Sequence, residues 1–217
     1  MAVNPLNKRS ANTVVVLDFE TTGLSPDLGD RAIEIGAVLV EDGRITDRFQ
    51  KLMNPSMRID SFIESYTGIS NAMVKGADSC SSVIKEFAEF IDQHNLVAHN
   101  ASFDKKFLDE EMYRAKIGYD GTFACSMLIA RRLYQNAPNH KLGTLVEYKK
   151  LPTEGVFHRA LADAEMTAHL WLTMLDDLES QYRISDVSFT LMKRLSRTAK
   201  ASAEAMLKKK AKSPVAG

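Results

Sequence analysis

The run Val14-Val-Val-Leu-Asp-Phe-Glu-Thr-Thr-Gly-Leu-Ser-Pro26 begins as a strand of β-branched residues and then carries two acids, Asp18 and Glu20. Side chains alternate along a strand, so these two acids share one face and Phe19 lies on the other. Two adjacent carboxylates repel each other, and burial makes that repulsion costly unless something offsets it. The pattern has two explanations: a strand end at which both acids reach water, or a site for a hard cation such as Mg²⁺, which takes oxygen ligands.

The sequence on either side of this run predicts a sheet. Asp42-Gly43 is a strong two-residue hairpin signal between two apolar runs, so those runs are expected to pair as antiparallel strands. Glu34 lies inside the first of these two runs. It is either an acid that supports the residues of a functional site or an acid exposed at the edge of the sheet. Strands are expected at 13–19, 31–41, 44–53 and 96–98.

Helices are predicted where apolar residues recur at helical spacing, as Val83, Ile84 and Phe87 do. Ser70 and Ser102 are suitable N-cap residues for the helices that follow them. Three strands followed by alternating helices and a strand indicate an α/β fold with a mixed central sheet flanked by helices. Helices are expected at 71–75, 81–93, 103–116, 125–135, 141–149 and 159–180.

Two further acids lie where the later elements would bring them to the same place. Asp104 is in the first turn of the helix after the short fourth strand, where a lone acid usually complements the helix dipole. Parallel neighbouring strands of an open α/β sheet end at a common edge, so Asp104 would approach Asp18 and Glu20 there. Asp163 follows His158 by five positions near the start of the last long helix, and both side chains can face one cleft.

Four carboxylates around one point, with a histidine beside them, match two-metal hydrolysis of a phosphodiester. In that chemistry, two cations about 3.5–4 Å apart stabilise the attacking and leaving oxygens of an in-line displacement. A histidine is suited to take a proton from the attacking water near neutral pH. The candidate catalytic residues are Asp18, Glu20, Asp104, His158 and Asp163.

An ordered set of short motifs resembles the DEDDh-type 3′→5′ exonucleases of the DnaQ-like group, the group of the proofreading subunit of bacterial DNA polymerase III. The motifs follow the family's order over about residues 13–175. A histidine, rather than a tyrosine, five positions before Asp163 is typical of the DEDDh subclass. The motifs are Asp18-Phe-Glu-Thr-Thr-Gly-Leu24, Ile33-Glu-Ile-Gly-Ala-Val38, Thr67-Gly-Ile-Ser70, Val97-Ala-His-Asn-Ala-Ser-Phe-Asp104, Lys141-Leu142 with Leu145, and His158-Arg-Ala-Leu-Ala-Asp-Ala164.

The resemblance implies an RNase H-like fold and two divalent cations, Mg²⁺ or Mn²⁺. It implies that Asp18, Glu20 and Asp163 hold one cation. Asp18 would bridge to the second cation, with Asp104 in support, and His158 would be the general base.

The resemblance also implies that the loop after Glu20 receives the 3′-terminal nucleotide. Asn100 would bind a phosphate or order its turn, and Phe103 would contact a base or sugar or belong to the core. The residues expected to bind substrate are Thr21, Thr22, Gly23, Leu24, Asn100 and Phe103.

The chain is formally neutral, but its charge is unevenly distributed. Residues 183–217 hold nine Lys or Arg against two acids, a net charge of +7, which leaves −7 for the rest. We expect an N-terminal segment at 1–12, an exonuclease domain at 13–180, and a basic helical extension at 181–217 with a disordered end.

The basic extension has no counterpart in the family pattern. Residues 185–211 are expected to form one long amphipathic helix. This helix would bind a nucleic-acid backbone, dock on a polymerase or repair protein or on the acidic body, or simply be solvated.

Cys80 and Cys125 show neither metal-ligand spacing nor a disulfide pattern, so the cytoplasm is the simplest expected location. The first residues lack the apolar core of a signal peptide, and no apolar run approaches membrane-spanning length.

The leading interpretation is a metal-dependent 3′→5′ exonuclease that releases nucleoside 5′-monophosphates, mainly from single-stranded DNA. RNA 3′ ends are the alternative substrate, as in the RNase T-like and oligoribonuclease-like relatives, because a few contacts outside the motifs can sense the 2′-OH. A catalytically inactive nucleic-acid-binding module is disfavoured, because such a module can lose any of the five catalytic groups and all five are present.

Overall fold

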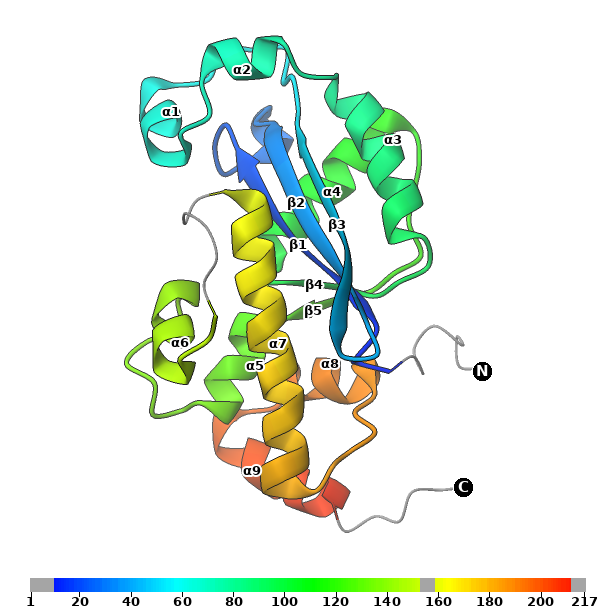
Figure 1. The fold of residues 1–217 in the computed structure, drawn as a ribbon, viewed down its shortest axis with the longest axis vertical. Helices are drawn as coiled ribbons and strands as arrows, with labels where there is room; N and C mark the ends of the chain where they lie inside the picture. Colours follow the sequence, from blue (N-terminus) through cyan, green and yellow to red (C-terminus); the bar gives the residue numbers. More distant parts are fainter. Residues whose placement is uncertain (1–9, 153–158, 212–217) are drawn as a thin grey trace.

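The computed structural model describes residues 10–152 and 159–211. A five-stranded mixed sheet with the strand order β3-β2-β1-β4-β5 forms its centre (Figure 1). The strands are β1 (Val14–Thr21), β2 (Ala32–Glu41), β3 (Arg44–Leu52), β4 (Leu96–Ala98) and β5 (Phe123–Cys125). β1 pairs antiparallel with β2, and β2 with β3, whereas β1, β4 and β5 run parallel. The predicted mixed α/β sheet is therefore confirmed, with β5 as an additional strand.

The β2–β3 hairpin turns where the sequence predicts it. Asp42 and Gly43 have φ values of 48° and 77°, and a two-residue type I′ turn requires positive φ at both central positions. This hairpin extends the sheet beyond β1, so β2 is an interior strand with neighbours on both sides.

Helices cover both faces of the sheet. Most agree with the predicted helices to within a few residues, whereas α1 and a short 3₁₀ helix, η2, were not predicted. Ser102 is the first residue of α4 rather than its cap, and the N-cap position is occupied by Ala101, whose side chain makes no capping hydrogen bond. The helices are η2 (Pro26–Leu28), α1 (Ser61–Thr67), α2 (Asn71–Lys75), α3 (Cys80–Ile91), α4 (Ser102–Ala115), α5 (Ser126–Leu133), α6 (Leu142–Lys149), α7 (Ala160–Tyr182), α8 (Phe189–Arg197) and α9 (Lys200–Ala211).

The alternation of side chains along β1 divides the core into two layers. Val14 and Val16 join a cluster with Trp171 of α7, whereas Val15 and Leu17 join a cluster with helices α3 and α4. Asp18 and Glu20 continue the series of Val14 and Val16, so their side chains lie on the α7 face of the sheet. Figure 1 shows α7 running along this face from its start beside the end of β1.

The C-terminal residues form two helices, α8 and α9, instead of the one long helix expected. The backbone leaves helical geometry at Thr198, with φ −70° and ψ 141°. Phe189, Leu195 and Leu207 are at most 1% exposed and belong to the same core cluster as Trp171. The basic extension therefore completes the α7-side core.

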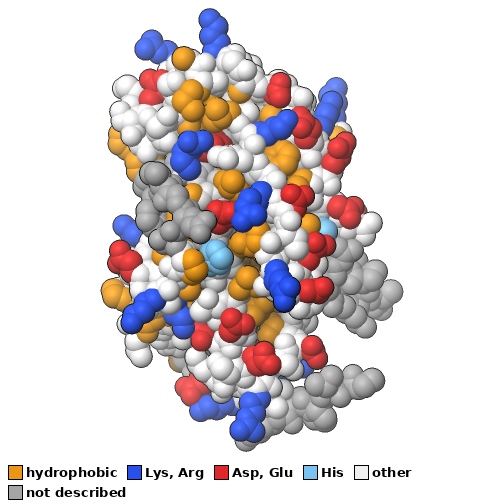
Figure 2. All heavy atoms as spheres, viewed as in Figure 1, with side chains coloured by type: hydrophobic (Ala, Val, Ile, Leu, Met, Phe, Trp, Pro, Cys, Tyr) orange, Lys and Arg blue, Asp and Glu red, His pale blue; other side chains and the backbone are white. Residues whose placement is uncertain are grey.

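Charges of both signs are interspersed over the face that α7 crosses, as Figure 2 shows, so this face carries no large field of one sign. Among the described residues, no helix combines the length and the apolar character needed to span a membrane.

Candidate metal centre and its cleft

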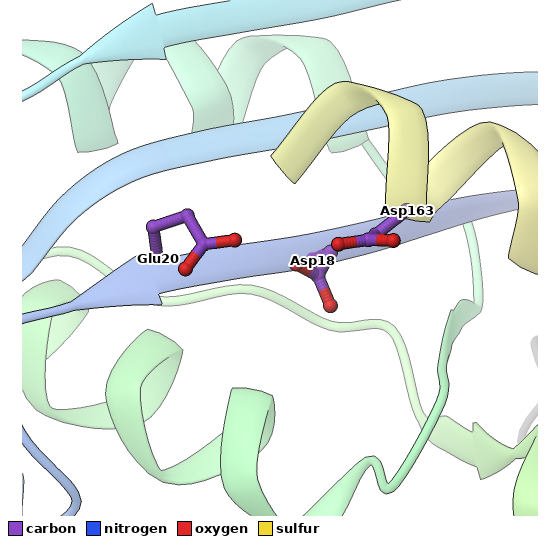
Figure 3. Close-up of side chains that lie close together, drawn as sticks. All are labelled: Asp18, Glu20 and Asp163. Carbon is purple, nitrogen blue, oxygen red and sulfur yellow. The ribbon is translucent and has the colours of Figure 1, made fainter. Parts of the chain in front are cut away.

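Three predicted acids converge at the end of β1. Asp18 and Glu20 project from β1, and Asp163 projects from the first turn of α7 toward them (Figure 3). One carboxylate oxygen from each residue lies within 4.8 Å of those of the other two. The side chains meet because β1 places both acids on the face that α7 covers.

The electrostatics of this group favour a bound cation. The pKa of Glu20 is raised to about 8, mainly by burial and then by the charges of Asp163 and Glu34. The pKa of Asp18 is raised well above its usual value, first by burial and then by Asp104, Asp163 and Glu20. Carboxylates in this state hold protons unless positive charge replaces them, and oxygen donors in such a set suit Mg²⁺ or Mn²⁺. The chemistry of the donor set therefore fits a divalent cation.

Asp104 lies behind the acidic group rather than within it. It is 1% exposed, and its Oδ1 accepts a hydrogen bond of 3.3 Å from the backbone N–H of Phe19. Burial raises its pKa to about 7, although that hydrogen bond acts in the opposite direction. Its charge also contributes to the raised pKa of Asp18, so the two groups are electrostatically linked.

A cleft of about 600 Å³ opens beside the acidic group. Asp18 and Asp163 line it together with Tyr66 of α1, His99 and the start of α6. Tyr66 is 52% exposed, and its ring stacks on that of Phe62 with a centroid distance of 5.9 Å and an interplanar angle of 13°. Lys141 and Thr144 also line the cleft.

His99 is held as a neutral ring at the end of β4. Its pKa is lowered to about 4, mainly by burial, with Arg131 also disfavouring the charged form. Its Nε2 lies 2.9 Å from the backbone oxygen of His140, which only accepts, so Nε2 carries the hydrogen and donates. Its Nδ1 lies 2.8 Å from the hydroxyl of Ser126, which also lies within hydrogen-bond distance of the backbone oxygen of Ala98, at 3.2 Å.

The loop after β1 is ordered by its own side chains. The hydroxyl of Thr21 donates to the carbonyl oxygen of Gly23 at 2.6 Å, and that of Thr22 donates to Asp30 at 3.2 Å. A Cβ on Gly23 would lie 2.3 Å from the Asp30 carboxylate, so a larger residue there would displace that carboxylate from its hydrogen bonds with Thr22 and Ser25. Leu24 is 76% exposed at the outer side of this loop.

The remaining predicted residues differ in their positions. Asn100 is exposed in the turn after β4, with a φ of 70°, and Phe103 is half-buried against Phe107 at a ring-centroid distance of 5.0 Å. His158 lies outside the described residues. The roles predicted for all three stay predictions.

Tyr66 lines the cleft although no sequence pattern predicted it. It lies in α1, a short helix without a clear periodic signal, and only the fold brings it to the acids. Lys141 lies in one of the family motifs, the one that contains Lys141-Leu142, but no chemical role was predicted for it.

A mixed sheet with three carboxylates gathered between β1 and α7 defines the RNase H-like class of metal-dependent nucleic-acid enzymes. The sequence matches the exonuclease family RNase_T over residues 15–171. The chain therefore belongs to the DnaQ-like DEDDh 3′→5′ exonuclease family.

Several similar proteins are DNA polymerase III components. The PolC-type DNA polymerase III of Caldanaerobacter subterraneus subsp. tengcongensis is 38% identical to this chain over 83% of the chain's length. The match covers only 13% of the length of that polymerase. The DNA polymerase III subunit epsilon of Aquifex aeolicus is 34% identical over 85% of this chain and 90% of its own length.

Solved structures share the fold. A structure of exonuclease X in complex with 5′ overhanging duplex DNA aligns with a TM-score of 0.66 and 27% identity, covering 84% of this chain and 99% of that chain. The RNase H-like DEDD exonuclease fold predicted from the motifs is confirmed.

Proposed function

We propose that this protein is a metal-dependent 3′→5′ exonuclease that shortens DNA from its 3′ end. The observation that carries the proposal is the convergence of Asp18, Glu20 and Asp163 in a chain of this family. The similar proteins include polymerase III components, which supports DNA as the substrate.

Asp18, Glu20 and Asp163 would hold a divalent cation, Mg²⁺ or Mn²⁺, and Asp104 would support a second one beside Asp18. Such cations polarise the phosphate and make the attacking water more acidic. Water oxygen bonds to the terminal phosphorus as the bond from phosphorus to the 3′ oxygen breaks. The leaving 3′ oxygen takes up a proton from solvent, so the products are a nucleoside 5′-monophosphate and a chain one nucleotide shorter with a new 3′-OH.

The chain's own residues position the substrate and move the proton. His158 is proposed to accept the proton of the attacking water. The exposed Leu24 and the ring of Tyr66 would contact the terminal bases, because stacking and apolar contact tolerate any base. Lys141, in the cleft wall, is suited to a phosphate of the same strand.

The basic extension is proposed to contact the nucleic-acid backbone further along the strand. A groove of about 680 Å³ between α4 and α8 is lined by Lys193, Arg197 and the aromatic rings of Tyr113, Tyr119 and Phe123. Within the described ranges, neither Lys193 nor Arg197 forms an ion pair with a carboxylate. Tyr113 is 77% exposed, and cations beside such a ring suit a single strand of nucleic acid. A polymerase or repair protein is the alternative occupant, which a binding comparison with single-stranded DNA would distinguish.

A degradation assay tests the proposal directly. The purified protein would be incubated with 5′-labelled single-stranded DNA, duplex DNA with a mismatched 3′ end, and RNA of matched sequence, each with Mg²⁺ or EDTA. We expect stepwise loss of 3′ nucleotides from DNA with Mg²⁺ and none with EDTA. Faster loss from RNA would transfer the proposal to RNA, and no loss from any substrate would refute it.

The cytoplasmic location stays a prediction.

A further inference from the structure

Glu34 is an acid with no part in the proposed chemistry, yet it is fully buried beside the metal centre. It lies on β2 directly opposite Glu20 of β1 in the strand register. It is 0% exposed, so it is neither at a sheet edge nor in water. A buried carboxylate persists only when it is paired and hydrogen-bonded.

Four hydrogen bonds satisfy this carboxylate completely. Arg159 donates to it twice, from Nη2 to Oε1 at 2.7 Å and from Nε to Oε2 at 3.1 Å. Gln50 of β3 donates to Oε1 at 2.9 Å, and the backbone N–H of Ala160 donates to Oε2 at 3.1 Å. These bonds use the roughly four acceptor positions of a carboxylate.

Two of the partners of Glu34, Arg159 and Ala160, lie at the start of α7, the helix that carries Asp163. Arg159 is the N-cap of α7, and its own side chain makes no capping hydrogen bond. Glu34 therefore caps this helix from a neighbouring strand by accepting from Ala160 N–H. The backbone oxygen of Arg159 in turn accepts from the N–H of Asp163 at 3.1 Å, which closes the first turn.

Gly36, two residues further along β2, allows the close approach that this arrangement needs. A Cβ at this position would lie 2.0 Å from the backbone nitrogen of Leu161. The first turn of α7 therefore lies directly on β2, with Glu34 and Gly36 on the same face of that strand. Figure 1 shows α7 starting over the adjacent ends of β1 and β2.

We infer that Glu34 and Arg159 are positioning residues that hold the first turn of α7 on β2, so that Asp163 completes the cation site with Asp18 and Glu20. The inference rests on the proposed function, because it assigns the pair a role in forming the metal centre. The bidentate geometry matters, since a guanidinium fork fixes the direction of its partner and an ammonium does not.

Direct Mn²⁺ binding to the substrate-free protein separates positioning from simple charge. Arg159→Met removes a cation near Glu20, so a charge effect alone would strengthen Mn²⁺ binding. Loss of positioning predicts the opposite: Mn²⁺ affinity weakened about 10- to 100-fold, the usual effect of losing an outer partner of a metal ligand. We expect kcat to fall by a similar factor and KM to change less than about threefold.

Two further variants keep the test decisive if Arg159→Met folds poorly. The double variant Glu34→Gln/Arg159→Met preserves the net charge and leaves no buried carboxylate unpaired, and we expect the same weak Mn²⁺ binding. Arg159→Lys keeps the charge without the fork, and we expect partial recovery of affinity. Circular dichroism at the assay temperature would establish the folded fraction of each variant.

Arg48→Met is the matched control. Arg48 of β3 contacts Glu165 of α7 at 2.6 Å, so it also joins the sheet to the first turns of this helix. Its side chain is 54% exposed, and such surface pairs contribute little. We expect unchanged Mn²⁺ affinity and kcat in this variant.

The outcomes distinguish this inference from the proposed function. Wild-type Mn²⁺ affinity and kcat in folded Arg159→Met and in the double variant would overturn the positioning role alone. A wild-type protein that binds no Mn²⁺ would overturn the metal centre and this inference together. Weak binding confined to the Glu34 and Arg159 variants supports the inference.

Discussion

Replacing Asp163 by asparagine should lower the activity of the protein but raise the stability of its metal-free form. In Asp163→Asn we expect kcat to fall more than about 100-fold, because even outer partners of metal ligands are worth about 10–100-fold. The metal-free protein should become more stable, because removing the charge of Asp163 relieves the repulsion that helps to raise the pKa values of Asp18 and Glu20. Thermal unfolding in EDTA and a 3′-end degradation assay measure the two effects.

Asp176→Asn serves as the control for this prediction, because it removes an acid from the exposed side of the same helix. This variant should change neither kcat nor the stability of the metal-free protein appreciably. A metal-free Asp163→Asn protein that melts below the wild type would contradict the proposed repulsion within the acidic group.

His99 should make folding depend on pH. Its folded pKa of about 4 lies below the ordinary value of 6.5, so between these values the unfolded chain binds more protons than the folded chain. The unfolding free energy should therefore fall as the pH drops from 6.5 toward 4, by up to about 3 kcal/mol from this group. It is fully retained above pH 6.5.

Urea unfolding of the wild type and His99→Gln at pH 7.5 and pH 5 isolates this contribution. The variant lacks the titrating ring, so the difference between the two proteins should shrink at pH 5. An equal loss of stability in both proteins would assign the pH dependence to other groups.

Residue chemistry explains which parts of the site were predictable. Asp18 and Glu20 were identifiable because strand periodicity places them on one face, and Asp104 and Asp163 because motif order gave them context. Glu34 was ambiguous, since a buried acid inside an apolar strand is explained only by Arg159, 125 positions away in sequence. No local pattern reports a partner at that separation.

At the scale of elements, long periodic segments were predictable and short ones were not. The β2–β3 hairpin and α7 follow from turn chemistry and from hydrophobic spacing. β5 is only three residues long, and its pairing with β4 decides that it is a strand. α8 and α9 were merged because the apolar spacing continues across Thr198, where tertiary packing turns the chain.

Helix α8 should contribute to the binding of longer single-stranded DNA. In the double variant Lys193→Ala/Arg197→Ala, the logarithmic salt dependence of single-stranded DNA binding should decrease by about 1.4, about 0.7 for each lost phosphate contact. Turnover of a trinucleotide at saturation should not change, because the groove and the catalytic cleft share no lining residue. Fluorescence anisotropy across a salt series measures the slope.

The matched control is Lys208→Ala/Lys210→Ala, which removes two exposed cations from α9 outside the groove. An equal decrease in slope for both double variants would indicate general electrostatic attraction to the extension. Full salt dependence in the Lys193→Ala/Arg197→Ala variant would remove α8 from the proposed nucleic-acid path.

Across the whole molecule, one core connects the catalytic face with both ends of the described chain. The indole N–H of Trp171 in α7 donates to the backbone oxygen of Ala11 at 2.7 Å, and Ala11 N–H donates to the backbone oxygen of Val187 at 2.8 Å. The helix that carries Asp163 is therefore supported at its middle, through Trp171, by residues before β1 and after Tyr182.

Truncation after Tyr182 tests whether the extension is part of the folding unit. Phe189, Leu195 and Leu207 would be lost from the α7-side core, and burial of each such side chain is worth about 1.5–3 kcal/mol. Their sum is comparable with the total stability of a typical domain, about 5–15 kcal/mol. We therefore expect the truncated chain to be inactive and, by circular dichroism, largely unfolded at 25 °C.

Two point variants refine this test. Leu207→Ala should lower the free energy of unfolding by about 2–5 kcal/mol, whereas Lys210→Ala on the exposed side of α9 should stay within about 0.5 kcal/mol of the wild type. A truncated chain with the wild-type melting temperature would instead make residues 13–180 an independent domain and the extension an appendage.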